Sequence, residues 1–140
     1  MKQSEAHEAL SDEVFADRFK NCSLNERPFT HRAHLRLAWI HLEKYGEDTA
    51  IKNICQQLQA YTRFVGAEEK YNHTLTIAAV KAVRYFADES SSDNFDGFIR
   101  EFPFLETDFR RLIGSHYSID VFNHLEAKTT FLKPDLDSFR

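Results

Sequence analysis

Cysteine, glycine and long apolar runs are scarce in this chain, and each shortage excludes a class of protein. The two cysteines, Cys22 and Cys55, lie far apart and form no C-x-x-C pair, so we expect neither a disulfide framework nor a thiolate zinc site. Only four glycines occur, and none of them forms a nucleotide-binding turn. No apolar run approaches the roughly 20 residues that cross a bilayer, and the polar start of the chain lacks a signal-peptide core. We therefore expect a cytoplasmic protein without a membrane span.

A surplus of basic residues is also lacking. The formal net charge is −4, and charges of both signs are interspersed along the chain, which argues against binding to nucleic acid or to an anionic membrane. The sequence contains no G-x-S-x-G, no H-E-x-x-H and no glycine-rich phosphate loop. It also lacks the paired E-x-x-H motifs of di-iron bundles. We expect no organic cofactor, and the sequence allows a homodimer.

Helix patterns, by contrast, follow one another along the chain, and strand patterns are absent. The chain of 140 residues is long enough for one ordinary domain, and its 13 phenylalanines supply large apolar side chains for a core. We predict an all-α fold, a single-domain bundle of about six or seven helices over residues 1–140. Residues 1–10 are predicted to be a flexible N-terminal segment in which His7 is solvated.

Capping residues and helix breakers predict where these helices begin and end. Pro28 marks a boundary before the second helix. The expected helices are one after Ser11, His31–Tyr45 between Thr30 and Gly46, one from Asp48 or Thr49 to Gly66, Tyr71–Ala87, one capped by Asp93, a short piece over 104–113, and one from Ser118 to about Ala127, followed by an irregular tail.

The helix over Tyr71–Ala87 is apolar around most of its circumference, which is typical of a central helix. We expect it to pack face to face with His31–Tyr45. Seven side chains of these two helices are predicted to be largely buried: Leu35, Trp39, Leu42, Leu75, Ala79, Val83 and Phe86.

Two histidines of the predicted His31–Tyr45 helix turn toward its apolar side. His31 and His34 are three residues apart, so both rings can reach one point beside the helix, as pairs of metal ligands do. Alternatively, His31 bonds locally near the helix start and His34 is a hydrogen-bonded core histidine. Burying either ring without a partner would cost roughly 1–3 kcal/mol. His41 lies on the same edge and is expected at the rim.

A second polar cluster, Glu68 to Thr76, begins the Tyr71–Ala87 helix. Asn72 or His73 could add a third metal ligand, although Asn72 is also a common helix cap. Tyr71 could act as a proton donor. A site rich in nitrogen ligands suits one divalent transition metal, namely zinc, iron, nickel or copper, with an open position for water or substrate.

Four motifs resemble, in the same order, those of a family of small bacterial helical proteins without an established activity. They are P-F-x-H-x-x-H-L-R-L-A-W (28–39), K-Y-x-x-T-L-T (70–76), H-Y-S (116–118) and F-L-K-P-D-L (131–136). The family's second motif usually reads Tyr-His-Glu-Thr, so Asn72 occupies its histidine position here and His73 follows. The resemblance also implies that Tyr117 supplies a phenol to the pocket.

Two functions from different classes remain open. The first, narrowly favoured, is a metal-dependent enzyme that acts on a small molecule. The second is a non-enzymatic helical module that binds a small ligand or a protein partner through an aromatic-lined pocket. In the first, the metal ligands and proton donors would come from one set of residues: His31, His34, His73 or Asn72 for the metal, and Tyr71 or Tyr117 for the proton.

Overall fold

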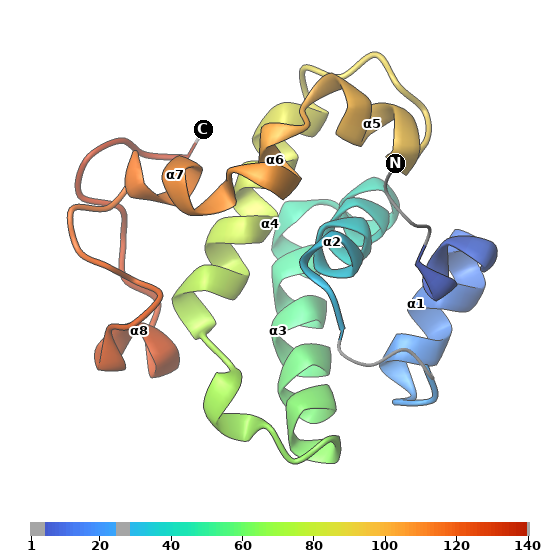
Figure 1. Ribbon diagram of the computed structural model, residues 1–140, viewed down its shortest axis with the longest axis horizontal. Helices are drawn as coiled ribbons and strands as arrows, with labels where there is room; N and C mark the ends of the chain where they lie inside the picture. The colour runs from blue at the N-terminus through green and yellow to red at the C-terminus, as the bar shows by residue number, and fades with distance from the viewer. Residues whose placement is uncertain (1–4, 25–28, 140) are drawn as a thin grey trace.

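The structure is a computed structural model that describes residues 5–24 and 29–139. This part of the chain is helical and contains no strand, which confirms the predicted all-α, single-domain fold (Figure 1). Its helices are η1 (Ala6–Ala9), α1 (Asp12–Lys20), α2 (His31–Tyr45), α3 (Glu47–Phe64), η2 (Glu68–Lys70), α4 (His73–Ala87), α5 (Phe95–Glu101), α6 (Phe104–Thr107), α7 (Phe109–Gly114) and α8 (Leu125–Thr129). Within the described ranges, no helix has both the length and the apolar character needed to cross a membrane.

The second helix begins and ends at the predicted residues, because both signals are local. The Thr30 side chain accepts a hydrogen bond from the Ala33 amide at 3.1 Å, which caps the first turn. Gly46 ends the helix with a φ of 84°, a left-handed conformation that glycine adopts without strain. Pro28, the predicted boundary, lies outside the described residues.

Several other helix ends differ from the prediction. The third helix begins at Glu47, directly after Gly46, and not at Asp48 or Thr49. Asn94 and not Asp93 caps α5, since its side chain accepts from the Gly97 amide at 2.8 Å. These shifts of one or two residues leave the order of the elements unchanged.

The prediction of the last helix, from Ser118 to about Ala127, is mostly wrong. Ser118 does not begin a helix, and α8 covers only Leu125–Thr129. The Ser118 amide donates instead to the Asp135 carboxylate at 2.9 Å, and the Ser118 hydroxyl bonds to the same carboxylate. A partner 17 residues away in sequence therefore replaces the capping role that the local pattern suggested.

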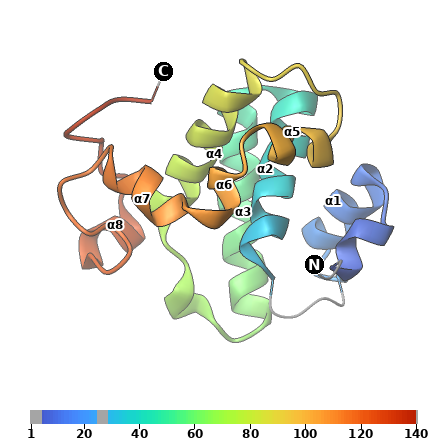
Figure 2. The same cartoon turned by 45° about the horizontal axis from the view of Figure 1, so that its top comes forward.

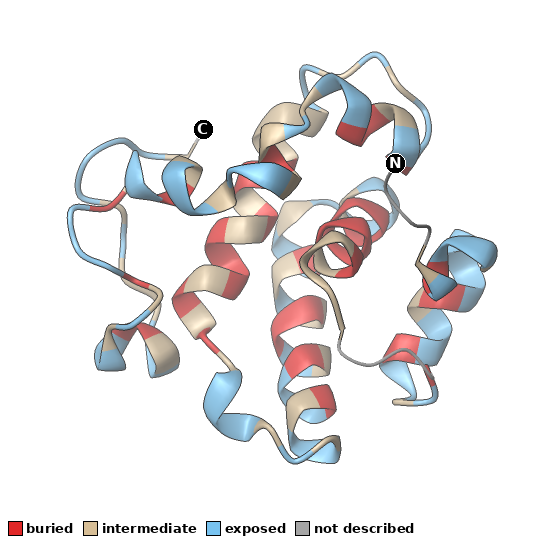
Figure 3. Ribbon diagram, in the orientation of Figure 1, coloured by how far each residue is buried: buried red, intermediate tan, exposed pale blue. Residues whose placement is uncertain are grey.

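The helices α2, α3 and α4 pack against one another and form the centre of the molecule, which confirms the predicted contact between α2 and α4. In both ribbon views α1 lies on one side of this centre, and α7 and α8 lie on the other (Figure 1; Figure 2). On the central helices, the parts of the ribbon coloured as buried lie where these helices face one another (Figure 3).

The burial predicted for the two central helices is confirmed in part. Leu35, Trp39 and Val83 are buried in the core. The other four predicted residues are only partly buried: Leu42, Leu75, Ala79 and Phe86. For Leu75 and Ala79 the reason is a cavity that these two side chains help to line.

His7, which lies near the N-terminus, is buried, so the prediction that it is solvated is wrong. Its Nε2 lies 2.9 Å from Oε1 of Glu5, and its Nδ1 lies 3.1 Å from Nη1 of Arg36. Arg36 is a buried cation in the middle of α2, and η1 supplies carbonyl and imidazole acceptors for it. Residues 1–4 lie outside the described part, and the flexibility of residues 1–10 stays a prediction.

Candidate functional site

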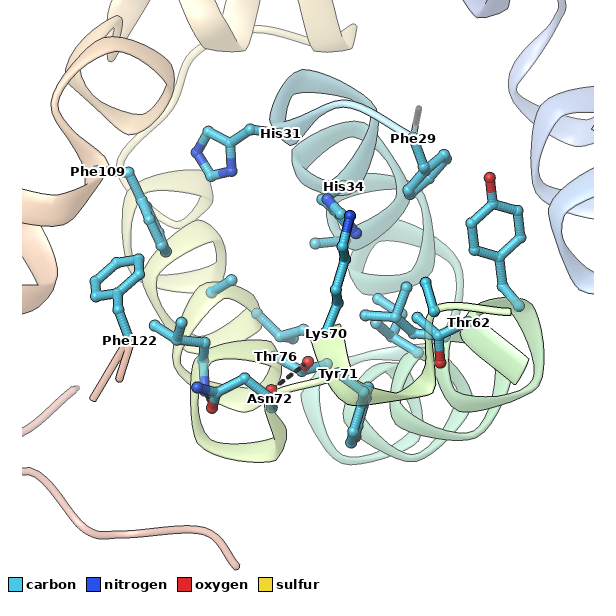
Figure 4. A pocket seen from close by; sticks show the side chains of 18 of the residues that line it. Phe29, His31, His34, Thr62, Lys70, Tyr71, Asn72, Thr76, Phe109 and Phe122 are labelled. Atoms are coloured by element: carbon cyan, nitrogen blue, oxygen red, sulfur yellow. Dashed lines mark hydrogen bonds between the residues drawn. The ribbon is translucent and has the colours of Figure 1, made fainter. Parts of the chain in front are cut away.

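A cavity of about 530 Å³ lies among α2, α3, α4 and α7 (Figure 4). Its wall is largely apolar and is closed on one side by aromatic rings from two later segments of the chain. The residues that form this apolar wall include Phe29, Leu58, Leu75, Ala79, Phe109 and Phe122. A hollow of this size is in the range that holds small organic molecules.

His31 lines this cavity at the start of α2. Its Nε2 lies 2.9 Å from the carbonyl oxygen of Leu105 in α6 and must donate, because a carbonyl only accepts. Burial lowers the pKa of His31, and the bond to Leu105 opposes this only in part. The ring is therefore neutral at neutral pH, and its Nδ1 keeps a lone pair. The Phe109 ring packs beside it, with centroids 4.6 Å apart.

His34 lies one turn further along α2 and lines the same cavity. Its ring meets the Phe29 ring edge-on, with centroids 4.6 Å apart. Burial, followed by the nearby charge of His31, lowers the pKa of His34 to about 4, and a hydrogen bond with the backbone of Thr30 works against this shift. No side-chain hydrogen-bond partner is found for the His34 ring in the part of the chain that the structure describes. The cavity thus receives a second neutral imidazole.

Asn72 also lines the cavity, but both ends of its amide bond to the protein. The Oδ1 atom accepts from the Leu75 amide at 3.0 Å and caps α4. The Nδ2 atom donates to the Val121 carbonyl at 2.8 Å, which ties the segment before α8 to the start of α4. This is the capping role that the sequence offered as the alternative to metal binding.

The structure does not bring His73 together with His31 and His34. His73 lines a second hollow, on the outer side of α3 and α4. Asn72 and His73 are adjacent at the start of a helix, so their side chains point in different directions. The side chain that caps α4 is the one that reaches the cavity.

Tyr71 contributes its ring to the cavity, while its hydroxyl faces the second hollow. The hydroxyl lies 2.8 Å from Nδ1 of His73 and accepts from Gln59 at 3.4 Å, and both partners line that hollow. Burial, together with Cys55, raises the pKa of Tyr71. In Figure 4 the side chain points away from the centre of the cavity.

Tyr117, the other predicted proton donor, does not line the cavity. It lies in the second core cluster, with Ala78 and Ile113. Its hydroxyl donates to the Leu132 carbonyl at 2.7 Å and anchors the C-terminal tail. Burial, and then the charge of Asp135, raises the pKa of Tyr117 to about 12.

His41 lies outside the cavity and is not at a rim, as the sequence suggested, because only 5% of its surface is exposed. Asn53 approaches its Nδ1 at 3.4 Å. Burial is the main reason that the pKa of His41 is lowered, and the charges of Lys44 and Lys20 add to it.

A three-ligand metal group does not form around His31 and His34 from histidine, cysteine, aspartate and glutamate side chains of the described residues. One such group occurs elsewhere in that part of the chain, at Glu5, His7 and Glu8. These side chains already bond to the protein: Glu5 accepts from the Thr30 hydroxyl at 2.5 Å, and Glu8 lies 3.3 Å from Nε of Arg32. We interpret that group as structural.

Lys70, Phe109 and Phe122 are among the lining residues of the cavity to which the sequence pattern assigned no role. Lys70 belongs to the K-Y-x-x-T-L-T motif and could have been singled out by that position. No local signal marks Phe109 or Phe122, because their place depends on how distant segments pack against α4.

Comparison of the chain with protein-family models, with curated proteins and with solved structures finds no match. The geometry of the cavity is therefore the basis on which a function is inferred.

Proposed function

We propose that this protein binds a small, largely apolar organic molecule in the cavity among α2, α3, α4 and α7. The observation that carries the proposal is a preformed cavity of about 530 Å³ with apolar and aromatic walls and a few polar groups. Such a role is the non-enzymatic alternative that the sequence left open, and it fits the predicted cytoplasmic location.

The exposure of the wall supports this proposal. Leu75 and Ala79 lie on the face of α4 that packs toward the centre, yet both stay partly exposed to the cavity. Covering apolar surface of this kind stabilises a complex by roughly 25 cal/mol per Å² before the costs of association. An apolar ligand would bury the surface that the protein itself leaves open.

Isothermal titration calorimetry with para-pentylanisole, an aromatic ether with a short alkyl chain, tests the proposal. Wild-type protein should bind it with a negative heat-capacity change, the mark of buried apolar surface. Ala79→Phe places a ring in the cavity and should abolish binding. Ala60→Phe is the matched control, because Ala60 is an exposed helical alanine that lines the second hollow. Failure of wild-type protein to bind, or equal binding by both variants, would contradict the proposal.

A metal-dependent enzyme is the second candidate, and one observation favours it. Metal-binding histidines usually donate their other ring N–H to a backbone carbonyl or a carboxylate, as His31 does to Leu105. His31 and His34 would then be two ligands of one divalent ion, with the rest from Asn72 oxygen, water or substrate. Titration of metal-free protein with Zn²⁺ tests this, with His31→Ala and His34→Ala as variants that lose the ion and keep the helical fold. Since the pKa of each ring is lowered, protons should displace the ion only below the ordinary range of histidine.

A further inference from the structure

The charges around the cavity limit what it can hold. Among its described lining residues, Lys70 is the one that carries a charge at neutral pH, and no carboxylate is present. No ion pair of its ammonium is found among the described residues, and neighbouring Glu68 pairs with Arg63 at 3.8 Å. Lys70 projects from the end of η2 among the lining side chains (Figure 4). A cationic ligand would meet this charge without a counter-charge, so a neutral or weakly acidic ligand is favoured.

Most hydrogen-bond donors of the cavity wall are already used by the protein. The hydroxyls of Thr62 and Thr76 donate to the carbonyls of Gln59 and Asn72, at 3.0 and 2.7 Å. The Asn72 amide donates to Val121. Together with Lys70, the lone pairs of the neutral imidazoles are therefore the main polar groups left for a ligand.

The imidazoles face the cavity as hydrogen-bond acceptors. The N–H of His31 is donated to Leu105, so its Nδ1 can only accept. The His34 ring is neutral as well and hydrogen-bonds the backbone of Thr30, so one of its two nitrogens keeps a lone pair. A ligand that meets both rings must bring a donor of its own.

We propose that the ligand of this cavity is a phenol, whose hydroxyl donates its one hydrogen to the imidazole lone pair of His31 or of His34 while its oxygen faces Lys70. The inference rests on the proposed binding function and names the class of its ligand. An aromatic body is favoured over an aliphatic one because the rings of Phe29, Phe109 and Phe122 form the wall. A phenol is also a stronger hydrogen-bond donor than an aliphatic alcohol, and the nearby ammonium of Lys70 strengthens it further.

A matched pair of ligands isolates the hydroxyl. Para-pentylphenol and para-pentylanisole share the ring and the alkyl chain, but the ether has lost the donor and gained apolar surface. Titration calorimetry in the presence of a chelator, which removes any adventitious metal, should show the phenol binding roughly tenfold more tightly than the ether. The ether binding as tightly as the phenol would overturn the inference while leaving the proposed binding function intact. Binding of neither compound would contradict the proposed function and this inference with it.

Variants of the two histidines test where the hydroxyl donates. In the double variant His31→Leu, His34→Leu, the affinity ratio of phenol to ether should fall to about one, because no imidazole lone pair is left. His116→Phe is the control, since His116 bonds to the backbone of Asp137 outside the cavity, and its ratio should stay at the wild-type value. Circular dichroism verifies that each variant is folded. A tenfold preference that survives in the folded double variant would contradict the assignment. If the double variant does not fold, the single variants replace it, and at least one of them should reduce the ratio.

Discussion

Two histidine sites lie against α2, and they use the imidazole ring in different ways. At the N-terminal site His7 has a protein partner on each ring nitrogen, Glu5 on one side and Arg36 on the other. At the cavity the His34 ring hydrogen-bonds the backbone of Thr30, contacts the Phe29 ring and faces the open cavity, with no side-chain partner among the described residues. A buried ring with both nitrogens bonded stabilises the fold, whereas a ring with an unused lone pair beside a cavity is able to accept a hydrogen bond from a ligand.

Both sites depend on α2, so the largest effect on stability should come from a substitution of a buried side chain of that helix. Trp39 is buried and packs near Phe95, with ring centroids 6.3 Å apart. Trp39→Ala should lower the free energy of unfolding by about 3–5 kcal/mol, because it leaves a large void. Phe64→Ala, at a residue that is 60% exposed, should change it little. Denaturant titration of both variants measures this, and equal midpoints would show that Trp39 does not hold the helix in place.

The second prediction concerns pH and separates His34 from every other titrating group. His34 has a lowered pKa of about 4 in the folded protein, against an ordinary value of 6.5. As pH falls below about 6.5, the unfolded chain takes up the proton first, so stability is lost between about pH 6.5 and pH 4. Wild-type protein should lose roughly 2–3 kcal/mol more than His34→Leu between pH 7 and pH 4. His31 and His41 act in the same direction in both proteins, and parallel pH profiles would contradict the burial of His34.

Direct substitution of the two histidines sharpens the comparison. His7→Ala leaves Glu5 and the buried Arg36 without their shared partner, and it should cost about 2 kcal/mol in unfolding free energy at pH 7. His34→Leu removes only the bond between the ring and the Thr30 backbone, replaces it by an apolar side chain, and should change stability by about 1 kcal/mol or less. Chemical denaturation at neutral pH gives both values. A larger loss for His34→Leu than for His7→Ala would reverse the roles assigned to the two sites.

The smallest expected effect is stabilisation by a bound ligand. A concentration of para-pentylanisole about ten times its Kd should raise the unfolding free energy of wild-type protein by about 1.4 kcal/mol, because the ligand binds only the folded state. Thermal unfolding should show this increase for Ala60→Phe and not for Ala79→Phe. An increase that Ala79→Phe retains would place the ligand outside the cavity.

Local sequence signals predicted the parts of this structure that depend on neighbours in the chain. Thr30 and Gly46 predicted both ends of α2. The apolar residues around the circumference of the 71–87 helix predicted the contact of α4 with α2. Ser118 misled the prediction because its partner, Asp135, lies in the C-terminal tail. The burial of His7 had no local signal, since it follows from the position of Arg36 on another helix.

The candidate site was predicted to a similar extent. His31, His34, Tyr71 and Asn72 do line one cavity, as their positions on two facing helices indicated. The helix pattern could not decide between Asn72 and His73, because the choice depends on which side chain caps α4. Tyr117 was drawn from a resemblance between motifs, and it anchors the tail instead.

The availability of the cavity imidazoles to a ligand is the central claim, and nitrogen-detected NMR of the histidine rings tests it most directly. Addition of para-pentylphenol to wild-type protein should shift the unprotonated ring nitrogen of His31 or of His34, because one of the two rings accepts the single hydroxyl hydrogen of the phenol. The ring nitrogens of His7 should not move, because both already have partners in the protein. Unchanged nitrogens at His31 and His34 with saturating ligand, or an equal shift at His7, would contradict this account.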